Sequence, residues 1–162
     1  MEDITTPVPL KLPASERKTI GWREKIRLPQ LGPDWIDAKI DTGARTSALH
    51  VKEIEPIEIN GQAMVRFKML DHAHPVWDGR QSLLPLVEKT VVRNSFGQEE
   101  ERWVVKAVIR LHKMTFETEF TLSDRSQMEF PVLLGRKALR KRFIVDVARR
   151  DVYFKRYQKR ST

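Results

Sequence analysis

Short segments in which polar and apolar residues alternate, separated by turn signals, recur along most of this 162-residue chain. Residues 25–28 and 35–40 alternate in this way, and Asn60-Gly61 is a strong hairpin signal because both residues accept a positive φ. A single segment, residues 136–143, has the composition and apolar spacing of a helix. The pattern therefore predicts an all-β fold, a closed or partly open barrel or a sandwich, with one short C-terminal helix.

The other segments complete the expected order of strands. Residues 90–93 and 102–111 are expected to form a second hairpin, and residues 143–147 and 152–154 to close the sheet. Residues 71–86 contain His, Pro, Gly and Trp without a period, so they are expected to form a loop. Further strands are expected at residues 51–59, 64–70, 115–122 and 130–134.

Positive charge is concentrated near the C-terminus. The chain has 30 Lys and Arg against 22 Asp and Glu, and residues 136–162 alone carry 11 basic and two acidic side chains. Such a basic end attracts phosphate, acidic peptides or anionic lipid, although a solvated helix face followed by a soluble tail has the same composition. The length indicates one domain, residues 19–157, preceded by a mobile or extended arm (1–18) and followed by a basic tail (158–162).

Composition excludes several classes of protein. The chain has no cysteine, which excludes disulfides, thiolate metal sites and a cysteine nucleophile. No stretch approaches the roughly 20 apolar residues of a membrane span, and residues 1–3 are acidic where a secretory signal would be basic. We therefore expect a cytoplasmic protein that does not act at a membrane.

The strongest chemical signal is Asp41-Thr42-Gly43-Ala44, at the end of the alternating segment 35–40. A carboxylate that leaves a strand into a glycine-containing turn is held rigidly and can be surrounded by backbone N–H donors. The glycine also allows another backbone or a substrate to approach closely. Asp and Gly are ordinary turn residues as well, so the tetrapeptide alone does not distinguish a catalytic loop from a structural turn.

A second segment supports the catalytic interpretation. Residues 130–136 read as an apolar strand that ends in Gly135-Arg136, directly before the expected helix. This order of elements resembles the retropepsins, the aspartic proteases of retroviral type. In them an apolar strand leads into Asp-Thr-Gly-Ala, a glycine-tipped hairpin follows, and two apolar residues, Gly and Arg then precede a short helix. The blocks 38–50 and 133–136 resemble more closely a bacterial retropepsin-like family that has been labelled "ATP-dependent zinc protease" and is associated with ATP-grasp glutamate ligases.

This resemblance implies a fold and a set of roles. The fold would be the acid-protease barrel, and Asp41 would be the catalytic residue of an aspartic endopeptidase. A flap would span residues 90–104 and close over the substrate. The residues that would support the active-site loop are Thr42, Gly43, Ala44 and Gly135, and those that would form the flap tip are Asn94, Ser95, Phe96 and Gly97.

One residue departs from the retroviral pattern. Retroviral enzymes place a second Asp after Asp-Thr-Gly-Ala, where it pairs with the arginine that follows the late glycine, whereas this chain has Arg45 there. Two arginines, Arg45 and Arg136, are therefore expected near the cleft as substrate-binding residues. They favour acidic substrates, such as glutamate-rich tails.

The residues give no support for a cofactor. The chain lacks a Gly-x-x-x-x-Gly-Lys-Ser/Thr loop for nucleotide phosphates and a His-Glu-x-x-His zinc helix, so we expect neither ATP nor zinc dependence. His72 and His74 lie two apart near Asp71 and Asp78, but a lone His-x-His in a polar loop is more often a surface feature than a metal site.

A single Asp-Thr-Gly requires a second copy of the chain. Aspartic hydrolysis needs two carboxylates around one water molecule, one acting as general base while the other protonates the carbonyl oxygen. The resemblance therefore implies a symmetric homodimer in which two Asp41 side chains meet at the two-fold axis. The alternative function is a non-catalytic, basic β-barrel that binds RNA or an acidic protein; nucleic acid is disfavoured because no aromatic stacking surface is evident.

Overall fold

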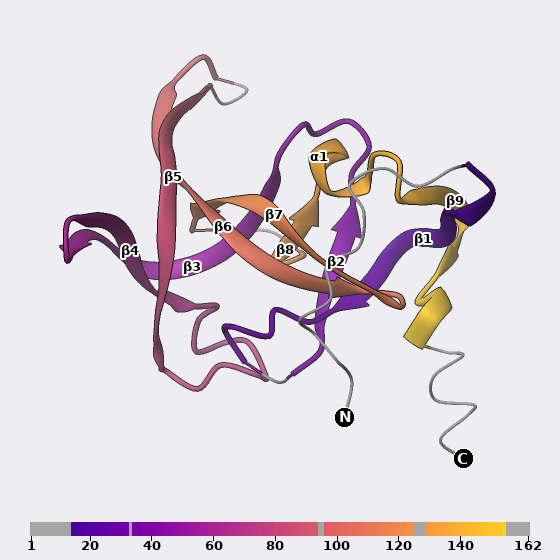
Figure 1. Cartoon of the computed structure of the whole chain (residues 1–162), viewed down its shortest axis with the longest axis horizontal. Helices are drawn as coiled ribbons and strands as arrows, with labels where there is room; N and C mark the ends of the chain where they lie inside the picture. The colour runs from indigo at the N-terminus through magenta and orange to yellow at the C-terminus, as the bar shows by residue number, and fades with distance from the viewer. Residues whose placement is uncertain (1–13, 33, 94–95, 125–128, 155–162) are drawn as a thin grey trace.

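The computed structural model describes residues 14–32, 34–93, 96–124 and 129–154. Strands dominate this part of the chain, and its helical pieces are short: η1 (Ala14–Glu16), α1 (Arg136–Leu139) and one turn at residues 152–154 (Figure 1). The predicted all-β fold with a short C-terminal helix is confirmed. The strands are β1 (Lys18–Ile26), β2 (Ile36–Ile40), β3 (Ser47–Ile59), β4 (Gln62–Met69), β5 (Gln81–Arg93), β6 (Glu99–Leu111), β7 (Met114–Ser123), β8 (Val132–Leu134) and β9 (Phe143–Arg150).

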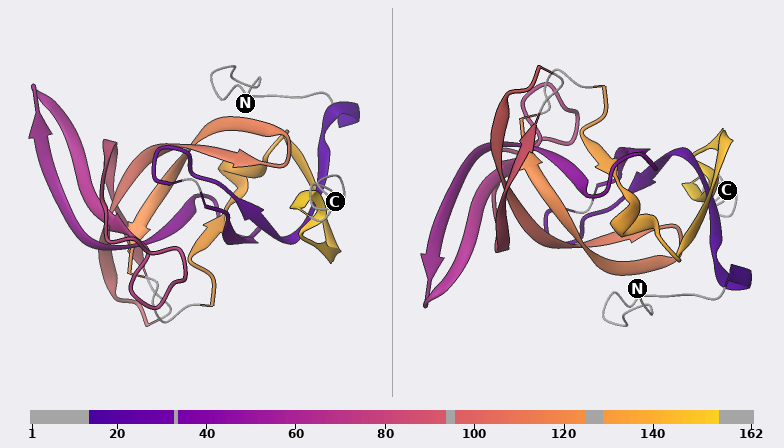
Figure 2. Two further views of the ribbon diagram at one scale, coloured as in Figure 1. Left: turned by 90° about the horizontal axis from the view of Figure 1, so that it is seen from below. Right: turned by 90° about the horizontal axis from the view of Figure 1, so that it is seen from above.

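The strands form one mixed sheet that closes on itself over part of its length. The order is β4-β5-β6-β7-β3-β8-β2-β1-β9, and β4 also pairs with β3, so that β3, β4, β5, β6 and β7 form a ring. A backbone bridge between Arg27 and Arg110 ties the chain just after β1 to β6. Figure 2 shows the β3–β4 hairpin projecting from one side of the molecule, with β1 and β9 on the opposite side.

Alternating residues of the strands fill a single core. In β6, Val105 and Ile109 are buried while Lys106 is exposed, as the two-residue period of a strand requires. Phe67 of β4 and Phe120 of β7 are among the largest fully buried side chains. Burying a side chain of this size contributes about 1.5–3 kcal/mol to the free energy of unfolding, so these residues anchor the ring.

Three local expectations are wrong. Strand β5 begins at Gln81, inside the expected loop 71–86, because residues 81–85 pair with β4. The helix ends at Leu139 because Arg140 leaves the helical region (ψ 129°) and Lys141 has a positive φ of 62°. Residues 152–154 form a helical turn instead of a closing strand.

The termini are described only in part. Most of the expected arm and all of the expected basic tail lie outside the described residues, although the last residue of the expected arm, Lys18, already belongs to β1. None of the helices in the described ranges has the length and apolar character needed to cross a bilayer.

Candidate active site

Asp41 lies where two parallel strands end together. It follows β2 directly, and its amide donates a hydrogen bond to the carbonyl oxygen of Leu134, the last residue of β8, at 2.9 Å. β8 lies between β2, with which it is parallel, and β3, with which it is antiparallel. The chain therefore leaves β2, turns through residues 41–46 and returns as β3 on the other side of β8. This topology brings Asp41 next to Gly135, which is far away in the sequence.

Backbone N–H groups hold the Asp41 side chain and turn. The Gly43 amide donates to Oδ1 of Asp41 at 2.9 Å, and the Ala44 amide donates to the main-chain oxygen of Asp41 at 3.2 Å. The Asp41 residue is half-buried, whereas Thr42 and Gly43 are exposed. The predicted turn is confirmed, and it fixes a carboxylate that solvent can reach.

Gly135 locks this turn from the other side. A Cβ atom at position 135 would lie 2.9 Å from the carbonyl oxygens of Ala44 and Thr46, so any larger residue would push the loop away. The Gly135 amide donates to Oγ of Ser47 at 3.1 Å, and the Arg136 amide donates to the carbonyl oxygen of Ala44 at 2.8 Å. The residues assigned to loop support are therefore brought together in space.

Basic residues lie on the turn and on and just after α1. The Arg136 guanidinium donates to the carbonyl oxygen of Thr42 at 3.1 Å, and the Arg45 side chain is exposed on the same loop. α1 adds Lys137, which is paired with Glu119 at 2.8 Å. Arg140 and Lys141 follow and are exposed. The two arginines predicted from the sequence therefore flank one turn, and the local charge is positive.

The predicted flap corresponds to the end of the β5–β6 hairpin. These strands pair in an antiparallel register from Leu86 to Arg93, and ion pairs join Lys89 to Glu101 (2.7 Å) and Arg93 to Glu99 (3.1 Å). In Figure 1 the hairpin rises above the rest of the sheet. Of the expected tip, Phe96 is 89% exposed and Gly97 has a φ of 79°, while Asn94 and Ser95 lie outside the described residues.

His50 contributes a second buried polar cluster next to β8. The His50 side chain is 4% exposed, and Nε2 lies 2.5 Å from Oδ2 of Asp71, while Nδ1 lies 3.7 Å from Oδ1 of Asp124. The hydrogen bond with His50 lowers the pKa of Asp71. The His50 amide also donates to Pro131 at 2.8 Å, just before β8. Sequence reasoning noted Asp71 only beside His72 and His74, and it linked neither carboxylate to His50 because both lie far from it along the chain.

The two remaining histidines of interest have local partners. The His72 ring packs against Trp77 in a tilted arrangement with ring centroids 4.0 Å apart, and Nδ1 of His74 accepts a hydrogen bond from the Val76 amide at 3.3 Å. Burial lowers the pKa of His74. Across the described ranges, no group of three or more His, Cys, Asp or Glu side chains is arranged to hold a metal ion.

The barrel and the interlocked Asp-Thr-Gly turn are those of a retropepsin-like protein. Residues 19–156 match the RimB-like family, described as "Retropepsin-like aspartic endopeptidase RimB". This chain belongs to the RimB-like family, which confirms the bacterial retropepsin-like family inferred from blocks 38–50 and 133–136.

Relatives carry this domain within longer chains. The chain is 35% identical over 136 residues to a probable alpha-L-glutamate ligase of Desulfotalea psychrophila, covering 82% of this chain and 28% of the ligase. It is 36% identical over 131 residues to the corresponding protein of Shewanella pealeana, covering 78% of this chain and 28% of the relative. The chain thus spans little more than a quarter of the curated relatives that it matches.

A solved structure extends the comparison to the fold. The crystal structure of Legionella pneumophila protein Lpg0085, described as having unknown function, matches with a TM-score of 0.72 and 27% sequence identity. The match covers 84% of this chain and 98% of the Legionella chain.

Proposed function

We propose that this protein is an aspartic endopeptidase in which Asp41 acts together with Asp41 of a second copy. The observation that carries the proposal is the turn after β2, where backbone amides orient a solvent-accessible carboxylate and Gly135 locks its loop. Membership in a family of retropepsin-like aspartic endopeptidases supports the same role.

The chemistry follows from a shared proton. Two aspartates at about 3 Å from each other cannot both ionise easily, so the pair titrates as a unit. The ionised Asp41 removes a proton from a water molecule that attacks the peptide carbonyl, and the protonated Asp41 donates its proton to the carbonyl oxygen. The Gly43 N–H group keeps Oδ1 of Asp41 in place while the proton moves. The flap hairpin would exclude water and hold the substrate.

Two features support association of two copies. The turn that contains Thr42 and Gly43 is exposed, so a second turn can approach it. In the described part of the chain β9 is the edge strand of the sheet, pairing with β1 alone. Its side chains Ile144 and Val147 are 50% and 80% exposed. An edge strand with exposed apolar residues readily pairs with another chain.

An acidic peptide is the substrate that the local charge favours. Arg45, Arg136, Arg140 and Lys141 lie on the turn or on and just after α1, and their positive field would attract a glutamate-rich segment. The long relatives are named as probable alpha-L-glutamate ligases, which supports a glutamate-containing substrate for this protein too. We assign Arg45 and Arg136 to substrate binding.

The test is digestion of a peptide library, read by mass spectrometry, with the wild-type protein and two variants. Asp41→Asn removes the catalytic proton exchange, and we expect a loss of cleavage of about 10²–10⁴-fold. Asp37→Asn is the matched control, since Asp37 lies on β2, the strand that leads to Asp41, in a partly exposed pair with Lys25, and its loss should leave cleavage intact.

Sedimentation of the same samples separates the possible outcomes. Asp41→Asn should remain folded and dimeric, and full cleavage by this variant would refute the assignment. If neither protein cleaves but both bind RNA or an acidic protein with a steep salt dependence, the alternative binding function is correct.

A further inference from the structure

A buried carboxylate outside the candidate active site joins the end of the described chain to the sheet. Glu24 of β1 is fully buried, and its Oε2 accepts hydrogen bonds from the amides of Gly21 (2.8 Å) and Val152 (3.1 Å). The Val152 amide begins the helical turn 152–154, so Glu24 caps that turn from a neighbouring strand.

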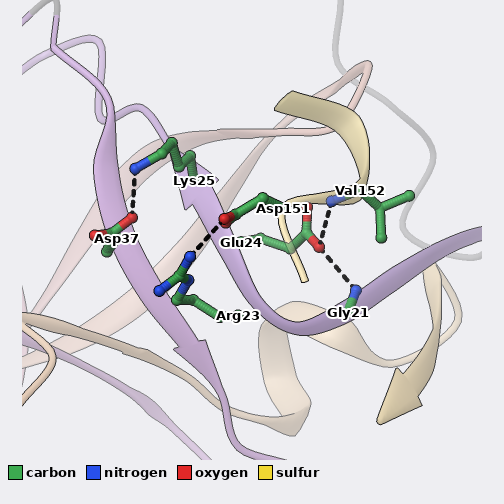
Figure 3. Close-up of polar contacts among 7 residues, drawn as sticks. All are labelled: Gly21, Arg23, Glu24, Lys25, Asp37, Asp151 and Val152. Carbon is green, nitrogen blue, oxygen red and sulfur yellow. Dashed lines mark hydrogen bonds and ion pairs between the residues drawn. The ribbon is translucent and has the colours of Figure 1, made fainter. Parts of the chain in front are cut away.

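An ion pair lies beside this cap. Arg23 donates to Oδ2 of Asp151 at 2.6 Å, and the Asp151 amide donates to the carbonyl oxygen of Arg23 at 2.8 Å. Figure 3 shows the Arg23–Asp151 ion pair together with the hydrogen bonds that Glu24 accepts from Gly21 and Val152. We call Gly21, Arg23, Glu24, Asp151 and Val152 the C-terminal clasp.

The hydrogen bonds of the clasp leave two carboxylate oxygens without donors. Oε1 of Glu24 and Oδ1 of Asp151 are both buried and have no hydrogen-bond partner among the described residues. Glu24 is 0% and Asp151 7% exposed, so water cannot solvate either group freely. A buried carboxylate oxygen that accepts no hydrogen bond lowers the free energy of unfolding, and this cluster contains two such oxygens.

The clasp also has more negative than positive charge. Two carboxylates face one guanidinium, and Arg23 is engaged with Asp151. The other charged pair nearby, Lys25 with Asp37 at 2.7 Å, is neutral within itself and partly exposed. One further positive charge would balance the cluster, and a proton on Glu24 supplies that charge. Nε of Arg23 is also buried and has no hydrogen-bond partner among the described residues.

We propose that Glu24 and Asp151 bind one proton between them, carried by Oε1 of Glu24, and that this proton closes the C-terminal clasp. In the protonated state Oε2 still accepts the Gly21 and Val152 amides, while Oε1 becomes a donor. When the proton is lost, two buried carboxylates repel each other and the turn 152–154 loosens. The clasp is therefore a proton-binding site that makes the attachment of the turn 152–154 to β1 depend on pH.

Burial and the neighbouring charge support this assignment. Desolvation raises the pKa of Glu24, and Asp151 raises it further, although the backbone donors act in the opposite direction. The charged groups near the clasp are Arg23 and Lys25 of β1, Asp37 of β2, Arg150 of β9, which is in register with Arg23, and Glu129, whose charge acts on Arg23. The backbone of Tyr153 adds a hydrogen bond to Glu24 that lowers its pKa, as those of Gly21 and Val152 do. His112, at the β6–β7 turn, stacks on Tyr153 with ring centroids 4.7 Å apart. Histidine side chains generally change charge near neutral pH, so this contact needs its own control.

The direct test is an isotope-edited infrared or NMR titration of the glutamate carboxyl groups in the full chain. We expect one protonated carboxyl signal to persist at pH values where exposed glutamates have ionised, and to vanish in Glu24→Gln. The control is Glu58→Gln, which removes an exposed glutamate of β3 and should leave the signal unchanged. Ionisation of Glu24 together with the exposed glutamates would overturn the proposal.

A stability measurement tests the consequence. The glutamine side chain introduced by Glu24→Gln resembles a protonated glutamate, because its amide group both accepts and donates. Glu24→Gln should therefore abolish the fall in Tm that the wild-type protein shows as the pH rises through the Glu24 pKa, whereas His112→Gln alone should leave that fall in place. A large loss of stability in Glu24→Gln at every pH would mean that the ionised carboxylate is the required form. Neither measurement involves peptide cleavage, so the inference stands or falls separately from the proposed protease function.

Discussion

Two carboxylates on neighbouring strands are held by backbone amides, yet their surroundings differ. Asp41 follows β2, is half-buried, and accepts the Gly43 amide at 2.9 Å. Glu24 lies on β1, is fully buried, and accepts the Gly21 and Val152 amides. Backbone amides therefore bind both carboxylates, although a substrate can reach Asp41 and cannot reach Glu24.

The difference shows what separates a candidate catalytic carboxylate from a structural one. A backbone donor fixes the orientation of either group, but only exposure allows a water molecule and a peptide to meet it. Burial instead places the group in a low-dielectric environment, where its proton affinity changes and becomes coupled to folding. Asp41 is thus suited to chemistry, and Glu24 to linking the chain end to the sheet.

Paired glycine substitutions give the sharpest contrast between the two regions. A Cβ at Gly21 would lie 2.1 Å from the carbonyl oxygen of Arg149, whereas a Cβ at Gly135 would lie 2.9 Å from that of Ala44. Both changes force backbone apart, which typically costs about 1–3 kcal/mol of unfolding free energy, and Gly21→Ala should cost more. Chemical denaturation measures the cost for each variant.

Cleavage activity should follow the opposite order. When activity is expressed per folded molecule, Gly135→Ala should reduce cleavage more than Gly21→Ala does, because the Gly135 substitution displaces the loop that carries Asp41. Gly32→Ala is the control, since its Cβ would meet only the Arg80 side chain at 3.7 Å. Equal losses of activity in both variants would show that the two regions are not separable.

The pH dependence of stability should have opposite signs at the two buried polar clusters. His50 lowers the pKa of Asp71, so the ionised carboxylate stabilises the fold above its unfolded pKa and this stability is lost as the pH falls through the folded pKa. The raised pKa of Glu24 acts in the other direction, so its contribution is present at low pH and is lost as the pH rises through the folded pKa.

Tm measured against pH separates the two contributions. Asp71→Asn should flatten only the acid limb of the curve of Tm against pH. Glu24→Gln should flatten only the limb at higher pH. Asp78→Asn, in the same loop as Asp71 but exposed, should change neither limb. An Asp71→Asn curve parallel to that of the wild-type protein would show that the His50 pair does not couple to folding.

Much of the candidate active site could be predicted from the sequence because its signals are local. The alternation of residues 35–40 gives the strand, and Asp41-Thr42-Gly43 gives the turn. Gly135 could be placed near that turn only through the family resemblance, since the contact depends on β8 inserting between β2 and β3.

The clasp and the His50 cluster could not be predicted from the sequence, because both depend on contacts between residues that are distant along the chain. Glu24 and Val152 lie at opposite ends of the chain, and their hydrogen bond exists because β9 pairs with β1. The apolar residues of 152–154 suit a strand or a helical turn equally, and in the structure the Val152 amide of the helical turn donates to Glu24. Tertiary pairing likewise extends β5 into residues without any visible period.

The smallest expected effect concerns the positive charges around the Asp41 turn. Arg45 is exposed, so its attraction for an acidic peptide is screened by solvent and is worth about 0.2–1 kcal/mol. Arg45→Gln should therefore raise KM for a glutamate-rich peptide by about 1.5–5-fold, leave kcat unchanged, and have less effect as the salt concentration rises. Lys113→Gln, an exposed charge at the β6–β7 turn, is the control. A neutral peptide affected as strongly as the acidic one would mean that Arg45 shapes the loop instead of selecting charge.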